Sequence, residues 1–272
     1  MRPSFISFLA SAVLALANSG VAHAQIEQGD RAWAMRAEVI DERLATPARI
    51  EDAILHYRAA LEADPLSLEA SWKLLRALHY AIDFTNLDDQ AKDARVADAV
   101  ELASASIEGL EARGGKDSDR ARLFFWSAIA WGTRAQRVGL LTIVREGAAG
   151  RMHDYAEQSL ALDPSVDRGG PLRLLSRLHA TLPRVPFISG WVDRDQALPL
   201  AERGYALDAA HPGNRLILAL ALLDQAPERM SEAQELLESV ASAEARADFL
   251  VEDLAIREQA REQLGVSSED SQ

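Results

Sequence analysis

Ala60-Leu61-Glu62-Ala63-Asp64-Pro65 is a helix-ending phrase that returns along the chain. It recurs as Ser159-Leu160-Ala161-Leu162-Asp163-Pro164, and a weaker copy, Gly204-Tyr205-Ala206-Leu207-Asp208, precedes Pro212. Proline has no N–H to donate and pushes the residue before it out of the α region, so Asp-Pro stops a helix. A helix-ending phrase that recurs predicts an array of helical repeats.

The first copy resembles the second helix and exit of a tetratricopeptide repeat. Ala53, Tyr57 and Ala60 lie at i, i+4 and i+7, on one face of a helix, and Pro65 follows. The small residues let a neighbouring helix approach, and the ring fills the remaining gap. Because the later copies are incomplete and unequally spaced, we expect an all-α fold that is a degenerate tetratricopeptide-repeat array, or α-solenoid.

The rest of the chain is also patterned for helices. Apolar residues make up 48% of it, with much alanine and leucine and almost no alternating strand pattern. We expect about eleven helices and no sheet over residues 25–265, beginning with a capping helix over Gln25 to Leu44. Residues 266–272 are expected to be a disordered tail.

The N-terminus has the features of a secretory signal peptide. Arg2 supplies the positive charge, Phe5 to Ala17 is apolar apart from serines, and Ala22-His23-Ala24 suits a signal peptidase. We expect residues 1–24 to be removed and the mature chain to be periplasmic; the alternative is an uncleaved N-terminal anchor. No later apolar run reaches the ~18 residues of a spanning helix, so no membrane span is expected in the mature chain.

Charge and cysteine content exclude several classes of partner and site. The formal net charge is −13, which disfavours nucleic acid and anionic lipid surfaces. The chain has no cysteine. Disulfides, thiolate metal sites and a lipoprotein anchor are therefore ruled out.

Motifs for catalysis are missing from the sequence. It contains no His-Glu-x-x-His spacing and no Gly-x-Ser-x-Gly elbow. Gly115-Lys116 is not a phosphate loop, because Asp117 stands where Ser or Thr is needed and Leu110 where glycine is needed. We expect no enzymatic activity, no catalytic residues, no cofactor and no metal site.

The stretch from Arg168 to Val192 has no acidic residue, although the whole chain is acidic. Its arginines and large aromatics are Arg168, Arg173, Arg177, Arg184, Phe187 and Trp191. Arginine's planar fork suits carboxylates, so this stretch is a candidate site for an acidic partner or an organic anion. The alternative is a solvated or structural set of arginines.

A second candidate site is the aromatic group between Arg120 and Arg137. Its members are Phe124, Phe125, Trp126 and Trp131. Core packing is one interpretation, and the other is that Phe125, Trp126 and Trp131 line an apolar groove or pore.

Three parts of the chain resemble the T-component of tripartite ATP-independent periplasmic (TRAP) transporters. They are the stretch Gly169-Gly170-Pro171-Leu172-Arg173-Leu174-Leu175-Ser176-Arg177-Leu178, the proline-rich hinge after it, and Ile256-Arg257-Glu258-Gln259-Ala260-Arg261. The resemblance implies degenerate tetratricopeptide repeats, a periplasmic solute-binding protein as partner, an apolar or amphipathic small ligand, and a homo-oligomer. The other function class is a general periplasmic scaffold for protein–protein interaction.

Overall fold

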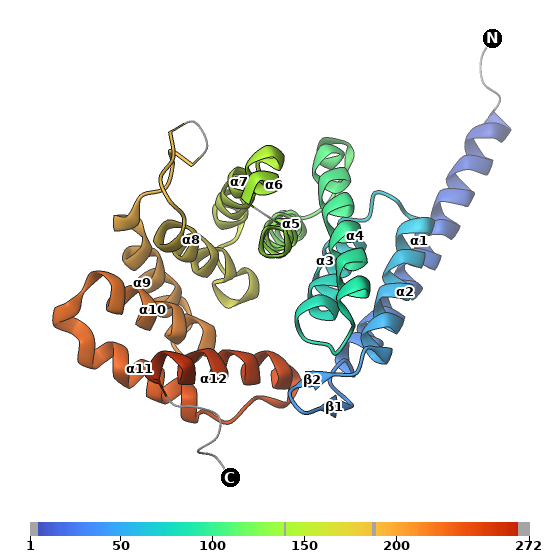
Figure 1. The fold of residues 1–272 in the computed structure, drawn as a ribbon. Coiled ribbons are helices and arrows are strands. Elements are labelled where there is room, and N and C mark those ends of the chain that lie inside the picture. The colour runs from blue at the N-terminus through green and yellow to red at the C-terminus, as the bar shows by residue number, and fades with distance from the viewer. Residues whose placement is uncertain (1–4, 139, 187–188, 266–272) are drawn as a thin grey trace.

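The computed structural model describes residues 5–138, 140–186 and 189–265, and they form an almost entirely helical chain (Figure 1). The helices are α1 (Phe5–Ala34), α2 (Ala48–Ala63), α3 (Leu68–Asp83), α4 (Asp89–Glu108), α5 (Asp117–Arg137), α6 (Leu140–Glu146), α7 (Ala148–Leu162), α8 (Gly170–Thr181), α9 (Ala197–Leu207), α10 (Pro212–Gln225), α11 (Met230–Ser242) and α12 (Leu250–Leu264). The expected all-α class is confirmed. The expected disordered tail, residues 266–272, lies outside the described residues.

The expectation of no sheet, with one capping helix over residues 25–44, was wrong. Helix α1 ends at Ala34, and β1 (Ile40–Asp41) pairs with β2 (Leu44–Ala45) as a two-stranded antiparallel hairpin. Glu42 turns the hairpin at a φ of 55°. The N–H of Ala45 also donates to the carbonyl of Phe84 at 2.9 Å. This bond to the end of α3 holds the short hairpin in place. The hairpin can therefore form although its residues lack the alternating pattern of a strand.

The three copies of the repeated phrase end α2, α7 and α9 in the same way. The N–H groups of Asp64, Asp163 and Asp208 donate to the carbonyls four residues earlier, at 2.8, 2.9 and 3.2 Å. Each aspartate Oδ1 then accepts a bond from the N–H two residues later, at 3.1, 2.9 and 3.0 Å. Such Asx turns reverse the chain without a glycine. The aspartate therefore has a structural role in all three copies, including the one whose proline comes late.

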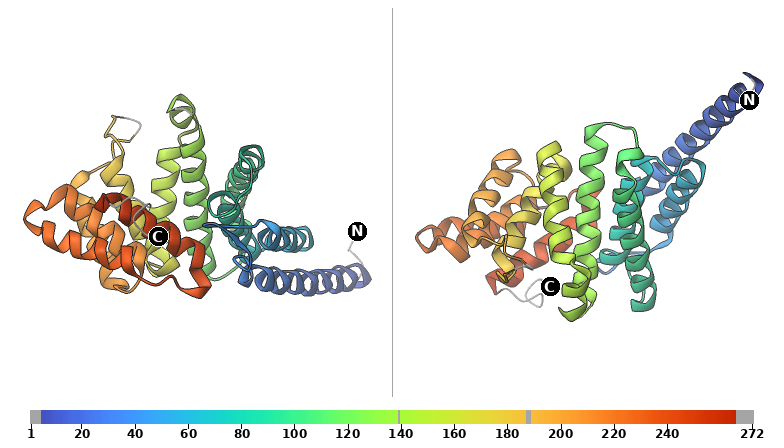
Figure 2. Two further views of the ribbon diagram at one scale, coloured as in Figure 1. Left: turned by 60° about the horizontal axis from the view of Figure 1, so that its bottom comes forward. Right: turned by 90° about the horizontal axis from the view of Figure 1, so that it is seen from above.

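Helices that follow one another along the chain pack side by side in an arc (Figures 1 and 2). In addition, α3 packs against α5, α8 against α10, and α10 against α12. Small residues allow neighbouring helices to approach closely. Ala60 of α2, for example, is fully buried and packs with Ile26 of α1 and Ala70 of α3. Ala53 and Tyr57 are also fully buried, so the predicted inward face of α2 is confirmed.

The C-terminal helix returns to the start of the array. In Figure 1, α12 lies beneath the arc, and its N-terminal end lies near the β1–β2 hairpin. Arg36, just after α1, binds Glu252 of α12 with N–O distances of 3.0 and 2.8 Å. Arg43 of the hairpin pairs with Glu258 at 2.7 Å. We call the Arg36–Glu252 pair the closing contact, because it joins the two ends of the arc.

Candidate functional site

Two of the four arginines predicted to bind a partner form ion pairs with acids of the same chain. Arg168 pairs with Asp208 at 2.5 Å. Arg173 donates to Asp167 at 2.6 Å and to Asn214 Oδ1 at 2.8 Å. Burial lowers the pKa of the Arg173 guanidinium, although its neighbour Asp167 opposes that shift. These partners connect the start of α8 to α9 and α10, which is the arrangement expected of structural arginines.

The other two arginines, Arg177 and Arg184, are exposed. Neither forms an ion pair with a carboxylate of the described residues. Trp191 is half-buried and stacks on His153, with ring centroids 4.0 Å apart. Phe187 lies outside the described residues. The structure therefore separates the predicted arginines into two, Arg168 and Arg173, that pair with acids of the protein, and two that are exposed and have no ion pair among the described residues.

The aromatic residues of α5 are mostly core. Phe125 and Trp131 are buried, in separate apolar clusters. Phe125 lies against Gly170 so closely that a Cβ at Gly170 would be 2.6 Å from its Cζ. Trp126 is half-exposed, and its ring centroid is 5.7 Å from that of His79. Of these three, only Trp126 has the exposure that contact with a ligand requires.

A row of alternating arginines and tryptophans runs from the C-terminal end of α1 across α3 to α5. We call it the arginine–tryptophan row, and its order is Arg36, Trp33, Arg76, Trp72 and Arg122. The guanidinium carbons lie over the neighbouring rings at 4.4, 3.9, 5.1 and 5.4 Å. Such contacts stabilise a cation without using a carboxylate.

Arg76 is the cation of this row that lacks an acidic partner. Arg36 pairs with Glu252 and Arg122 with Asp119, whereas no carboxylate in the described part of the chain pairs with Arg76. Its Nε is buried without a hydrogen-bond partner. Burial also lowers the pKa of this guanidinium. The indole rings of Trp33 and Trp72 lie over this guanidinium, and the neighbouring Tyr57 and Asp30 also favour its charged form.

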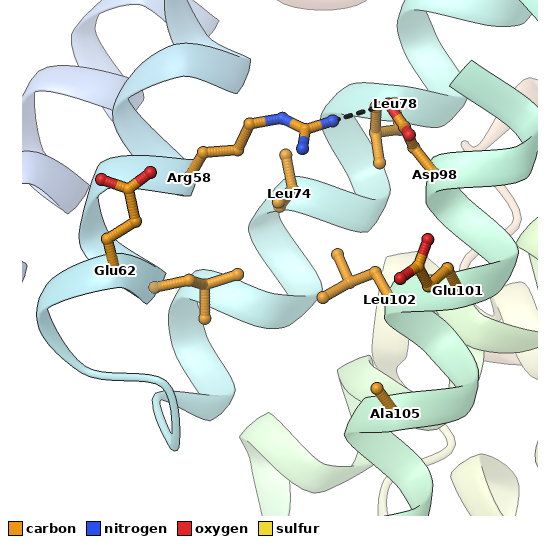
Figure 3. Close-up of a pocket in the computed structure, with 9 residues that line it drawn as sticks. Arg58, Glu62, Leu74, Leu78, Asp98, Glu101, Leu102 and Ala105 are labelled. Atoms are coloured by element: carbon orange, nitrogen blue, oxygen red, sulfur yellow. Dashed lines mark hydrogen bonds and ion pairs between the residues drawn. The ribbon is translucent and has the colours of Figure 1, made fainter. Parts of the chain in front are cut away.

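A pocket of about 420 Å³ lies between α2 and α4, with α3 as its floor (Figure 3). Its apolar lining is Leu61, Leu74, Leu78, Leu102 and Ala105. Leu74 and Leu78 are buried, and the others are partly or fully exposed. The volume is within the range of small-molecule sites, and the lining has the apolar character typical of them.

Charged side chains of α2 and α4 border this pocket. Arg58 reaches across to Asp98 at 2.7 Å, as Figure 3 shows. Glu62 and Glu101 lie on opposite sides of the pocket. Neither is paired with a cation of the described residues. The pocket therefore combines an apolar floor with two free carboxylates.

Sequence reasoning missed both the arginine–tryptophan row and the pocket. A partial signal was present, since Trp72 and Arg76 lie at i, i+4 and so share a face of α3. Trp33, however, comes from a different helix, and nothing local in the sequence brings it to Arg76. The pocket likewise requires knowledge of which helices flank α3.

The described residues contain no group of three or more His, Asp or Glu side chains that could hold a metal ion. No helix among them combines the length and the apolar character that a bilayer crossing requires. Comparison with protein-family models and with curated proteins finds no match to this chain.

Proposed function

We propose that this protein is a non-enzymatic, periplasmic helical-repeat protein that acts as a T-component-like accessory of a TRAP-type solute uptake system. In this role it binds an acidic surface of a solute-binding protein. The observation that carries the proposal is the exposure of Arg177 and Arg184, without acidic partners among the described residues, in a chain of net charge −13. Exposed arginines favour an acidic partner, since opposite charges across an interface attract.

We also propose that the helical array is a degenerate tetratricopeptide-repeat solenoid. Support comes from the shared Asx turn after α2, α7 and α9, and from contacts between alternate helices such as α3 with α5 and α8 with α10. Repeat arrays of this kind present extended surfaces to partners. A general periplasmic scaffold is the second candidate function, favoured by the same contacts.

We expect the double substitution Arg177→Ala, Arg184→Ala to weaken binding of the cognate solute-binding protein by roughly threefold to tenfold, since charges at the rim of an interface contribute modestly. The effect should be largest at low salt, because screening is weakest there. The measurement is isothermal titration calorimetry at two salt concentrations. The matched control is Arg145→Ala, Arg203→Ala, which removes two exposed arginines of α6 and α9.

Equal affinity of the two double variants would contradict this binding surface. No detectable binding of the wild-type chain to a TRAP-type solute-binding protein of the same organism would contradict the transporter role. In that case, capture of a different periplasmic partner with the same dependence on Arg177 and Arg184 would favour the scaffold.

We expect export with cleavage after Ala24, and a mature chain that keeps its first helix docked. Helix α1 runs unbroken through Ala24, and polar contacts beyond Ala24 hold it to α2. Gln25 binds His56 at 2.8 Å, and Tyr57 donates to Asp30 at 2.8 Å. Mass spectrometry of the periplasmic fraction should show a chain that begins at Gln25. An intact N-terminus in the membrane fraction would show that residues 1–24 are retained as an anchor.

A further inference from the structure

A series of ion pairs connects α2 and α4 and then stops at the pocket. Glu51 of α2 pairs with Arg95 of α4 at 2.5 Å. Arg95 also lies 3.6 Å from Asp98, and Asp98 pairs with Arg58 of α2 at 2.7 Å. Because the partners advance in the same direction along both helices, α2 and α4 run parallel here. Opposite charges thus alternate across the gap between these helices.

One helical turn further along, the charges no longer alternate. Residue 62 follows Arg58 by one turn of α2, and residue 101 follows Asp98 by about one turn of α4. Both positions carry glutamate, and the two side chains lie on opposite sides of the same pocket (Figure 3). Two like charges cannot bridge the gap. A cation between them would continue the series of ion pairs.

The floor between the two glutamates is apolar. Leu74 and Leu78 of α3 form its buried part, and Leu61 and Leu102 flank it. A hydrated inorganic cation gains nothing from such a floor, whereas a cation with a hydrocarbon chain buries that chain against the leucines. The pocket's volume, about 420 Å³, accommodates a small molecule of this kind.

We propose that this pocket is a binding site for a small amphipathic organic cation, such as an alkylammonium ion, held by Glu62 and Glu101 over the leucine floor. The site is separate from the surface of Arg177 and Arg184, and its charge preference is the opposite. The ammonium group lies between the two carboxylates, and the alkyl chain lies against Leu74 and Leu78. The Arg58–Asp98 pair closes one end of the site.

The test uses three ligands with the same hydrocarbon chain and different charge: octylammonium, octanol and octanoate. The mature chain is titrated with each by isothermal titration calorimetry, below the concentration at which the ligand aggregates. We expect saturable binding of octylammonium, weaker binding of octanol and the weakest binding of octanoate. Binding of octanoate as tight as that of octylammonium would overturn the proposal, as would the absence of saturable octylammonium binding.

Substitutions then locate the site. Glu62→Gln, Glu101→Gln should weaken octylammonium binding by roughly threefold to tenfold and leave octanol unchanged, since only the ionic contacts are lost. The control Glu235→Gln, Glu238→Gln removes the same charge from two exposed glutamates of α11 that form no ion pair with the described residues. Equal weakening by both double variants would mean that octylammonium responds only to net charge, and the site would be rejected.

Charge reversal gives a result that altered folding cannot produce. Glu62→Lys, Glu101→Lys should change the preferred ligand from octylammonium to octanoate, because both side chains are exposed and the leucine floor is untouched. Far-UV circular dichroism and the melting temperature confirm that the variant is folded. A folded variant that still prefers octylammonium would place the binding site elsewhere.

Discussion

Arg36→Ala should lower the free energy of unfolding by about 3–5 kcal/mol, because it leaves a partly buried carboxylate without its partner. The Arg36 side chain is 5% exposed, and Glu252 is 18% exposed. Arg36 also donates to the carbonyls of Trp33 and Asp248. Its guanidinium carbon is 4.4 Å from the Trp33 ring centroid. The measurement is equilibrium unfolding in urea, followed by circular dichroism.

Arg43→Ala is the matched control, since Arg43 and Glu258 also join the hairpin region to α12. Arg43 is 51% exposed, and Glu258 is 27% exposed, so their pair is screened by water. Its loss should cost less than about 1 kcal/mol. The double variant Arg36→Ala, Glu252→Ala should lose less stability than the two single variants combined, because it leaves no unpaired charge. Similar losses for Arg36→Ala and Arg43→Ala would mean that the closing contact is as solvated as a surface pair.

Asn214→Leu should destabilise the protein by about 3–5 kcal/mol, since several buried polar groups lose their partner together. Asn214 Nδ2 lies within hydrogen-bond distance of the carbonyls of Gly204, Arg168 and Asp208, at 2.9, 3.1 and 2.9 Å. Its Oδ1 accepts from Arg173 at 2.8 Å. One amide therefore joins the end of α9 to the start of α8.

The backbone held by Asn214 is strained. Asp167 and Arg168 both have positive φ values, 48° and 55°, which cost non-glycine residues of order 1–3 kcal/mol each. Arg173 also donates to their two carbonyls, at 2.9 and 3.1 Å. Loss of the amide should therefore loosen this turn as well. Thermal unfolding by calorimetry measures the effect, and Asn86→Ala, at an exposed asparagine, should change stability by less than about 0.5 kcal/mol. Equal melting temperatures for the two variants would refute this role of Asn214.

The sequence predicted what is encoded locally. The helix ends at Asp64, Asp163 and Asp208 were predicted because an aspartate and a nearby proline act on their own backbone. The inward face of α2 was predicted because Ala53, Tyr57 and Ala60 repeat with the helical period, and all three are buried. The all-α class follows from the same periodicity.

Features that depend on distant residues were not predicted. Arg173 and Arg177 were assigned to one candidate site because both belong to the stretch from Arg168 to Val192, which has no acidic residue. Arg173 instead binds Asp167, one residue before the acid-free stretch, and Asn214, far along the chain. Counting charges within the stretch therefore could not reveal that Arg173 is paired. The pocket between α2 and α4 was missed for the same reason, since it depends on how three helices assemble.

The closing contact also has a consequence for how such a chain can change in length. An open helical array can gain or lose a helix pair and disturb only its immediate neighbours. Here Arg36 and Glu252 touch although 216 positions separate them. An added pair would lengthen the arc, carry α12 away from the hairpin and expose Arg36. Duplication or deletion of a helix pair would therefore break the closing contact and cost this protein the stability that the contact supplies.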